Sequence, residues 1–282
     1  ADVLIDSISL INGEDSGLKI LKNDGTVTLN RVVIASSTGT GSQAGGLHVQ
    51  NWQTTGDNSQ LNVVIKDSIL KQNNAVLGGG IKCTGGFGDV PVSFQLSEGT
   101  VIHENQSENF GGGGIYLSAC DMTFMAGVNH SENNGDLEIY NNTSTGSGGG
   151  FFIQDAELML LGDEMSAFDI ANNVSGDLQN NTASGGGLFA VGTAEVTLTN
   201  SHIRSNKAQK YGGGIYATGT VQVLMDIDAN GCQYDDHCSQ LSGNQQLNQS
   251  GGDGVGALAA GGDATVQIKR SLTQIKDTYN CG

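Results

Sequence analysis

The sequence predicts an all-β protein, a single right-handed parallel β-helix (solenoid) of six to eight coils with side loops. Three observations predict it: a recurring glycine pair, a recurring asparagine three residues after an apolar residue, and short alternating apolar runs between them. The composition agrees, because 44 glycines accompany a single proline, whereas glycine-rich disordered chains are usually rich in proline too. We expect one domain over residues 1–282, with clear repeats from about 27 to 275.

The first repeated element is a glycine pair followed by an apolar residue. Between the second residues of successive pairs the steps are 34, 34, 36, 37, 27 and 42 residues, a period typical of a solenoid. Because the steps differ, we expect loops of different length to leave a common coil. The instances are Gly45-Gly46-Leu47, Gly79-Gly80-Ile81, Gly113-Gly114-Ile115, Gly149-Gly150-Phe151, Gly186-Gly187-Leu188, Gly213-Gly214-Ile215 and a weaker Gly256-Ala257-Leu258, in which Gly256 ends the last step.

The second element is an apolar residue with asparagine three positions later. Asparagine tolerates tight turns, and its amide can hydrogen-bond along a stack of its own kind. A third element, Val63–Asn73, aligns without gaps on Val196–Asn206, and Val27–Ser37 fits the same template. Each repeat is therefore expected to hold three short strands. The apolar-x-x-Asn pairs are Leu70/Asn73, Ile102/Asn105, Ile139/Asn142, Leu178/Asn181, Ile203/Asn206 and Leu241/Asn244.

Side loops account for the variation in the step. The shortest step, 27 residues, approximates a bare coil, and the surplus is expected in loops such as Trp52–Leu61 and Met165–Asn180. Loops on a rigid frame commonly carry binding residues. Trp52 is the only tryptophan and a candidate ligand anchor; the alternative is that its ring packs the loop onto the rod.

Five cysteines allow two intramolecular disulfides. Cys232 and Cys238 bracket five residues, a spacing that a disulfide closes easily. Cys83 and Cys120 follow corresponding glycine pairs in successive coils, so a second disulfide between them is a candidate. Cys281 is left over. The alternative is five reduced thiols that behave as small hydrophobes.

The glycine-pair and apolar-x-x-Asn elements together resemble the repeats of the polymorphic outer-membrane proteins, and of bacterial right-handed β-helix surface proteins more widely. The resemblance covers about residues 27–275. It implies an exported, surface-exposed β-helix with a role in adhesion. Two features depart from the family pattern. The third residue of the first motif is mostly Ile, Leu, Gly or Phe where the family has Ala, and we expect no counterpart of the family's C-terminal membrane barrel.

The formal net charge of −17 is concentrated in the middle of the chain. From Cys83 to Ile203, 121 residues contain fifteen Asp and Glu and no Lys or Arg. Such a field repels nucleic acid, anionic membranes and acidic polysaccharides, and it attracts cations and basic proteins. Two interpretations stay open: the charge keeps a secreted protein soluble, or it binds divalent cations.

One local motif suggests calcium. Asp226, Asp228 and Asn230 place oxygen ligands at alternate positions before a turn-forming glycine, as in loops that wrap Ca²⁺. The match is incomplete, because His237 stands where an EF-hand loop has its bidentate glutamate. The alternative is that both aspartates are outward residues of a strand that ends at a turn. No cofactor is required by either interpretation.

The sequence argues against an enzyme. Lyases that act on acidic polysaccharides need a basic groove and a strong base, which the central stretch lacks. A hydrolase of neutral glycans needs only two carboxylates roughly 5–10 Å apart. Asp155, Glu157 and Asp169 are candidates on one face of the solenoid, but outward carboxylates on a solvated face are far commoner. Ice binding would need a regular Thr-x-Thr array that only two coils approach.

We therefore expect a non-catalytic binding or adhesion module, extracellular or on a bacterial cell surface. Its expected partners are a host or neighbouring cell surface, a neutral glycan or a basic protein, and neither nucleic acid nor a membrane into which this chain inserts. No stretch of 18 apolar residues is present. The main alternative is a structural subunit that assembles end to end into a homo-oligomer or fibre, because uncovered terminal coils invite strand pairing. A carbohydrate-active β-helix enzyme is the lesser alternative.

Overall fold

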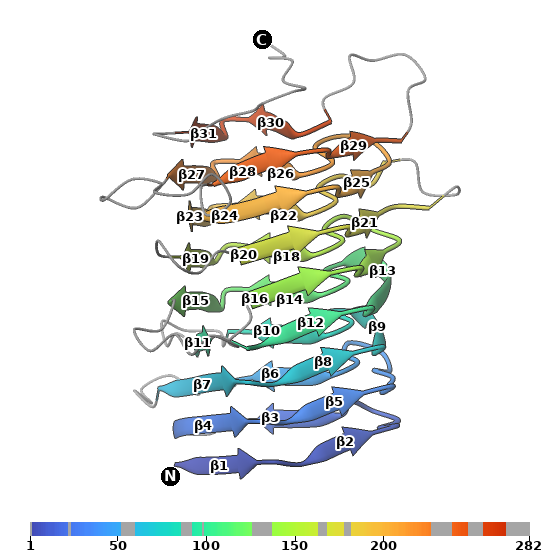
Figure 1. Ribbon diagram of the computed structural model, residues 1–282, viewed down its shortest axis with the longest axis vertical. Helices are drawn as coiled ribbons and strands as arrows, with labels where there is room; N and C mark the ends of the chain where they lie inside the picture. The colour runs from blue at the N-terminus through green and yellow to red at the C-terminus, as the bar shows by residue number, and fades with distance from the viewer. Residues whose placement is uncertain are drawn as a thin grey trace.

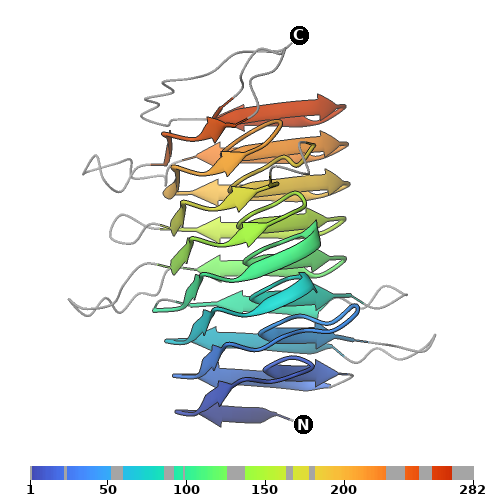
Figure 2. The same ribbon diagram turned by 90° about the vertical axis from the view of Figure 1, so that its right-hand side faces the viewer.

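The computed structural model describes residues 2–21, 24–51, 60–85, 92–97, 99–125, 137–162, 168–177, 182–226, 239–247 and 256–268. These ranges contain 31 strands and no helix, and therefore none long and apolar enough to cross a membrane. All strand pairs are parallel and form four sheets that run along one axis (Figures 1 and 2). The predicted parallel β-helix is confirmed.

The chain visits the four sheets in a fixed order, which we number sheet 1 to sheet 4. Sheet 1 contains β1 (Val3–Asp6), β4 (Gly25–Asn30), β7 (Leu61–Lys66), β11 (Val92–Leu96), β15 (Asp121–Met125), β19 (Glu157–Leu161), β23 (Glu195–Thr199), β27 (Gln222–Asp226) and β31 (Thr265–Ile268). Sheet 2 contains β2 (Ser9–Ile11), β5 (Val33–Ala35), β8 (Ile69–Lys71), β12 (Val101–His103), β16 (Leu137–Tyr140), β20 (Phe168–Ala171), β24 (Ser201–Arg204) and β28 (Gln240–Ser242).

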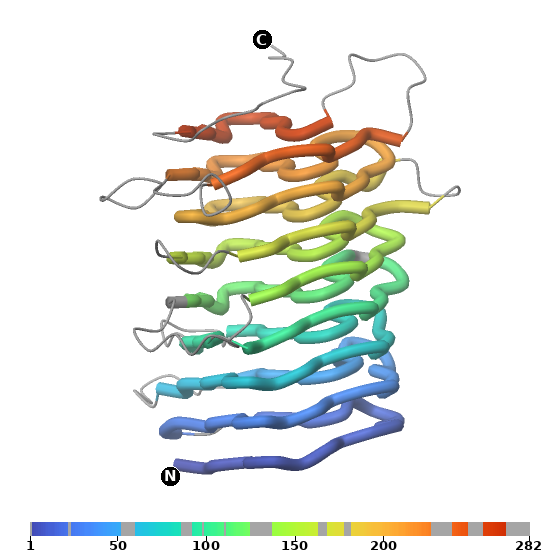
Figure 3. The backbone as a smooth tube through the Cα atoms, viewed as in Figure 1, coloured from blue at the N-terminus to red at the C-terminus, as the bar shows by residue number. Residues whose placement is uncertain are grey.

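Sheet 3 is short and contains β9 (Asn74–Leu77), β13 (Gln106–Gly111), β17 (Thr143–Ser144), β21 (Val174–Ser175), β25 (Lys207–Ala208) and β29 (Gln245–Gln246). Sheet 4 contains β3 (Leu18–Leu21), β6 (Leu47–Gln50), β10 (Ile81–Thr84), β14 (Ile115–Ser118), β18 (Phe151–Gln154), β22 (Leu188–Gly192), β26 (Ile215–Gly219) and β30 (Leu258–Gly262). The strands thus make eight coils and the first strand of a ninth, which the tube in Figure 3 follows from end to end.

The glycine pairs stand directly before the strands of sheet 4, as the repeat predicts. Ile115 pairs in register with Ile81 on one side and with Phe151 on the other. Glycine is needed here because successive coils lie too close for a side chain. A Cβ on Gly114 would lie 2.8 Å from the carbonyl oxygen of Gly150. The left-handed turn is made one residue before the pair, as at Gly112, whose φ is 68°.

A ladder of asparagines runs through the interior beside these glycines. The amide Nδ2 of Asn142 donates to Oδ1 of Asn173 at 3.1 Å and to the carbonyl oxygen of Ile102 at 2.9 Å. The backbone N–H of Asn142 donates to the same Oδ1 at 2.9 Å. The side-chain amide of Asn142 is therefore satisfied by the neighbouring coils. The ladder consists of Asn73, Asn105, Asn142, Asn173, Asn206 and Asn244.

Three sequence predictions about the coils are wrong. The fourth ladder position belongs to Ile170/Asn173 and not to Leu178/Asn181, which lie outside the described residues. Residues Met165–Asn180 are not a side loop, because β20 and β21 lie inside this span. Ile170/Asn173 and Leu178/Asn181 both fit the apolar-x-x-Asn pattern. They differ in whether the extra residues of this repeat lie before or after the asparagine of the ladder. The coils from β7 onward also contain a fourth strand, in sheet 3, where the sequence predicted three.

The core is a column of inward side chains from alternate strand positions. Ile102, Ile139, Ile170 and Ile203 stack in sheet 2, each no more than 1% exposed. Their neighbours in sequence therefore point outward.

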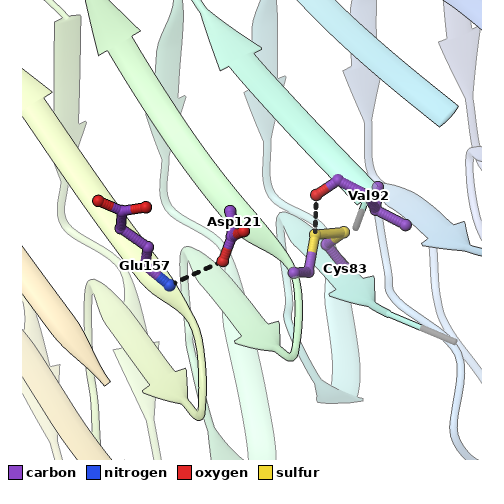
Figure 4. The surroundings of a disulfide bond; sticks show 5 residues. Cys83, Val92, Asp121 and Glu157 are labelled. Carbon is purple, nitrogen blue, oxygen red and sulfur yellow. Dashed lines mark hydrogen bonds between the residues drawn. A yellow bond between two sulfur atoms is a disulfide. The ribbon is translucent and has the colours of Figure 1, made fainter. Parts of the chain in front are cut away.

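The structure contains the Cys83–Cys120 disulfide (Figure 4). The register partner of Cys83 is Leu117, and Cys120 lies three residues beyond, in the corner before β15. The two Cα atoms are 5.9 Å apart, and both side chains are fully buried. The bond thus links two successive coils. Cys232, Cys238 and Cys281 lie outside the described residues, so the Cys232–Cys238 bond stays a prediction.

The asparagine ladder predicts a large stability loss on Asn142→Ala. Removing Oδ1 leaves the backbone N–H and Nδ2 of Asn105 without their acceptor inside the core. We expect unfolding in urea to show a loss of about 2–4 kcal/mol, because unpaired buried donors cost more than the bond itself contributed. Thr143→Ala is the matched control: its exposed side chain should change stability by less than about 0.5 kcal/mol. Equal losses in both variants would contradict the role of the ladder.

Candidate functional site

The outward face of sheet 2 carries a group of ionisable side chains and one tyrosine that could contact a ligand. Because the isoleucines of β12, β16, β20 and β24 point into the core, the residues beside them point to solvent. Glu138, Asp169 and His202 occupy one row of register partners. A second row holds His103, Tyr140, Ala171 and Arg204. We call the set His103, Glu138, Tyr140, Asp169, His202 and Arg204 the polar face.

An ion pair joins two coils of the polar face. Arg204 Nε donates to Asp169 Oδ1 at 2.9 Å, and its Nη2 donates to Oδ2 of the same carboxylate. The Asp169 side chain is 17% exposed and that of Arg204 is 54% exposed. The hydrogen bonds to Asp169 raise the pKa of Arg204, with further contributions from the charges of Asp169 and Glu138. Such a bidentate pair is planar and fixed in direction, which suits the recognition of polar ligands.

The sequence analysis missed this pair. Arg204 is the first residue after the stretch without Lys or Arg. The stacking of the coils places it beside Asp169, which lies 35 residues earlier in the sequence. Alignment of Ile170 with Ile203 would have revealed it. The mistaken placement of the ladder at Asn181 hid that alignment.

An aromatic pair lies on the same face, one coil away. The rings of His103 and Tyr140 stack with centroids 4.9 Å apart and an interplanar angle of 14°. Burial lowers the pKa of His103, and it outweighs the charge of Glu104, whose Oε1 lies 3.6 Å from His103 Nδ1. Burial also raises the pKa of Tyr140, together with the charges of Glu138 and Glu104. On its other side Tyr140 has the small Ala171 as its register partner.

The three carboxylates predicted to share a face do not do so. Asp155 lies in the corner before β19 with a φ of 49°, and its Oδ1 accepts the backbone N–H of Thr193 at 3.0 Å. Asp155 is therefore a structural contact between corners. Glu157 begins β19 in sheet 1, where its backbone N–H donates to Asp121 at 2.9 Å (Figure 4). Only Asp169 belongs to sheet 2, so the predicted grouping is wrong.

Most of the other predicted site residues lie outside the described residues. Asp226 ends β27, whereas Asp228, Asn230 and His237 lie outside the described residues. Trp52 also lies outside them. Within the described part of the chain, no three His, Cys, Asp or Glu side chains converge on one point where a metal ion would bind. Calcium binding at residues 226–230 and a ligand anchor at Trp52 stay predictions.

A shallow depression lies on sheet 1, on another face of the rod. Its volume is about 160 Å³. Only Glu195 among its lining residues carries a carboxylate, so it lacks the pair that glycoside hydrolysis needs. The lining consists of Glu195, Val196, Thr197, Gln222, Val223, Leu224, Thr265 and Gln267.

Comparisons with known proteins give no further assignment. No family model, no curated protein and no solved structure matches this chain significantly. Inference about function therefore starts from the polar face and the fold that positions it.

The polar face predicts the direction in which Glu104→Gln changes the titration of His103. The carboxylate favours the imidazolium, so its removal should lower the pKa of His103 further below the ordinary value of 6.5. An NMR titration of the imidazole proton signals measures the shift. Glu108→Gln, which removes a carboxylate bound to Asn74, should leave that pKa unchanged. A rise in the pKa of His103 on Glu104→Gln would contradict the electrostatics described above.

Proposed function

We propose that this chain is a non-catalytic binding module of the adhesion type, which presents the polar face to a neutral glycan or a basic protein at a cell surface. The observation that carries the proposal is the polar face itself. It offers an aromatic ring, a fixed guanidinium–carboxylate pair and a further carboxylate on successive coils. Binding energy in interfaces concentrates on Tyr, Trp and Arg, and small-molecule sites combine aromatic surface with a few placed polar groups.

The frame supports a binding role. The side chains of the polar face stand on strands whose register is fixed on both sides, so a ligand loses little free energy in ordering them. The Cys83–Cys120 disulfide favours an oxidising compartment, and we therefore place the protein outside the cell or on its surface. The resemblance to bacterial β-helix surface proteins points the same way. No cofactor is part of the proposal, and Ca²⁺ at residues 226–230 stays a prediction.

Binding of neutral glycans and basic peptides by purified variants tests the proposal. We expect Tyr140→Ala to weaken binding by about tenfold or more, as truncation of an aromatic anchor does. Asp169→Asn should also weaken it, because Arg204 loses its partner. Thr197→Ala, an equally conservative change on sheet 1, is the matched control and should bind as the unmodified protein does. Equal affinity in all variants would contradict the polar face as the site.

The same assay separates binding from catalysis. Glu138 and Asp169 are register partners on neighbouring strands, and a pair of carboxylates is what glycoside hydrolysis requires. Release of reducing ends from a glycan, lost in Asp169→Asn, would replace the binding proposal by an enzyme.

A second candidate function, assembly end to end, is favoured by the first coil. Among the described residues, no strand pairs with the outer edges of β1, β2 and β3. Leu4, Ile11 and Leu21 point outward and are 67%, 58% and 52% exposed, where the next coil has Thr28, Ala35 and Gln50. Inward residues are uncovered too, since Val3 is 43% exposed and its partner Val27 only 4%. An apolar coil with open edges is a template for another β-coil.

Light scattering with size-exclusion chromatography tests the assembly. If a second copy covers the first coil, the protein should form dimers or filaments that the double change Leu4→Asp and Ile11→Asp converts to monomers. Thr143→Asp is the control, because Thr143 is exposed on β17, in the middle of the rod and away from both ends. A protein that is monomeric at all concentrations would contradict this candidate and leave the binding proposal untouched.

A further inference from the structure

Within the connection between β5 and β6, residues 40–44 fold over the outward face of sheet 4, and we call them the strap. Beneath it lie two basic side chains that are register partners, His48 in β6 and Lys82 in β10, and Lys19 in β3 continues their row at the margin. His48 is 3% exposed and Lys82 is 6% exposed. In a chain of net charge −17, a lysine buried to this degree is unusual.

Hydrogen bonds from side chains of sheet 4 hold the strap. The ammonium of Lys82 donates to the carbonyl oxygen of Ser42. The backbone N–H of Ala44 donates to Nδ1 of His48 at 3.4 Å. Two further contacts lie at the margin: the hydroxyl of Thr40 bonds to the carboxylate of Asp15, and the hydroxyl of Ser16 donates to the carbonyl oxygen of Ala44.

The contact with Ala44 requires a neutral imidazole. Since Nδ1 accepts a hydrogen bond, it carries no proton, and the proton of the neutral ring is on Nε2. Nε2 lies 3.2 Å from Oε1 of Gln50 and donates to it. Protonation of His48 would place a second N–H against the N–H of Ala44. The contact would then change from attractive to repulsive.

The charges that face His48 act in the same direction. Lys82 lies on one neighbouring strand and Lys19 on the other, and the strap itself contains no ionisable side chain. The one carboxylate bonded to this row is that of Asp15, which pairs with Lys19 at 3.0 Å. Burial lowers the pKa of His48, followed by the charge of Lys82, and the hydrogen bond to Gln50 offsets them only in part. Burial also lowers the pKa of Lys82.

We propose that the strap is a pH-sensitive cover, which protonation of His48 releases from sheet 4 so that His48 and Lys82 become exposed. Stability of the closed strap is fully present at high pH and is lost as the pH falls, because the open state binds the proton more readily than the closed state. Acidification then gives an acidic rod a cationic spot that attracts anionic groups. This inference is independent of the polar face, which belongs to sheet 2.

Hydrogen exchange of the strap amides, measured by mass spectrometry on the full chain, tests the cover. Rates at pH 7.5, 6.5 and 5.5 are divided by the intrinsic chemical rates. Below about pH 6.5, protection should fall by up to tenfold per pH unit until the pKa of the closed state is reached. In His48→Gln, protection should no longer depend on pH. His202→Gln, a histidine change in sheet 2, is the matched control and should keep the full response.

A measurement on the unmodified protein keeps the test independent of whether His48→Gln folds. Nitrogen-15 NMR should find the Nε2–H tautomer of His48 at pH 7.5 and a pKa below 6.5. Lys82→Met should raise that pKa, since it removes a facing charge. The proposal is overturned by the Nδ1–H tautomer, by a pKa at or above 6.5, by protection that ignores pH in the unmodified protein, or by an unchanged pH response in His48→Gln.

Discussion

Each coil of this β-helix presents rows of backbone donors and acceptors on its two flat sides, and only the next coil can satisfy them in the interior. Between sheets 2 and 3 the backbone turns and cannot form a regular ladder there. At that point the asparagine side chains supply the hydrogen bonds between coils. Along the ladder, Oδ1 accepts two N–H groups from the preceding coil, and Nδ2 donates to a carbonyl oxygen of the preceding coil. Glycine pairs let the backbones approach closely enough for these bonds. Asparagine and glycine are therefore parts of one constraint.

This constraint fixes the register, and the register assembles everything else. Asp169 and Arg204 are 35 residues apart in sequence and meet because Ile170 and Ile203 stack in the core. His103 and Tyr140 stack for the same reason. The strap meets His48 and Lys82 because the glycine pairs at 45–46 and 79–80 align β6 with β10. The Cys83–Cys120 bond adds a covalent link between two coils whose spacing the ladder already sets.

The positions of the charged side chains on the surface follow from this register of the coils. The carboxylates of the central stretch are spread over corners and several sheets, and those with contacts in the structure are held by different groups. Asp155 accepts from Thr193, Asp121 from the backbone of Glu157, and Asp169 from Arg204. The basic residues are equally constrained, since Lys82 is covered by the strap. A chain that is strongly acidic in composition thus carries a mixed polar face on one side, and a covered lysine with a neutral histidine beside it on another.

The sequence by itself determined the solenoid, the strand that follows each glycine pair, and five of the six ladder positions. These features are local: a glycine where no Cβ fits, and an asparagine at a tight turn, recur because every coil meets the same constraint. The tertiary structure alone decided where surplus residues leave the frame, and this decided that Asn173 and not Asn181 completes the ladder. It also decided that Asp155 and Asp169 lie on different faces and that Arg204 reaches Asp169. The period of a repeat predicts how often equivalent strands recur along the sequence. The physical position of a side chain depends on which connection is long, and that follows from packing between coils.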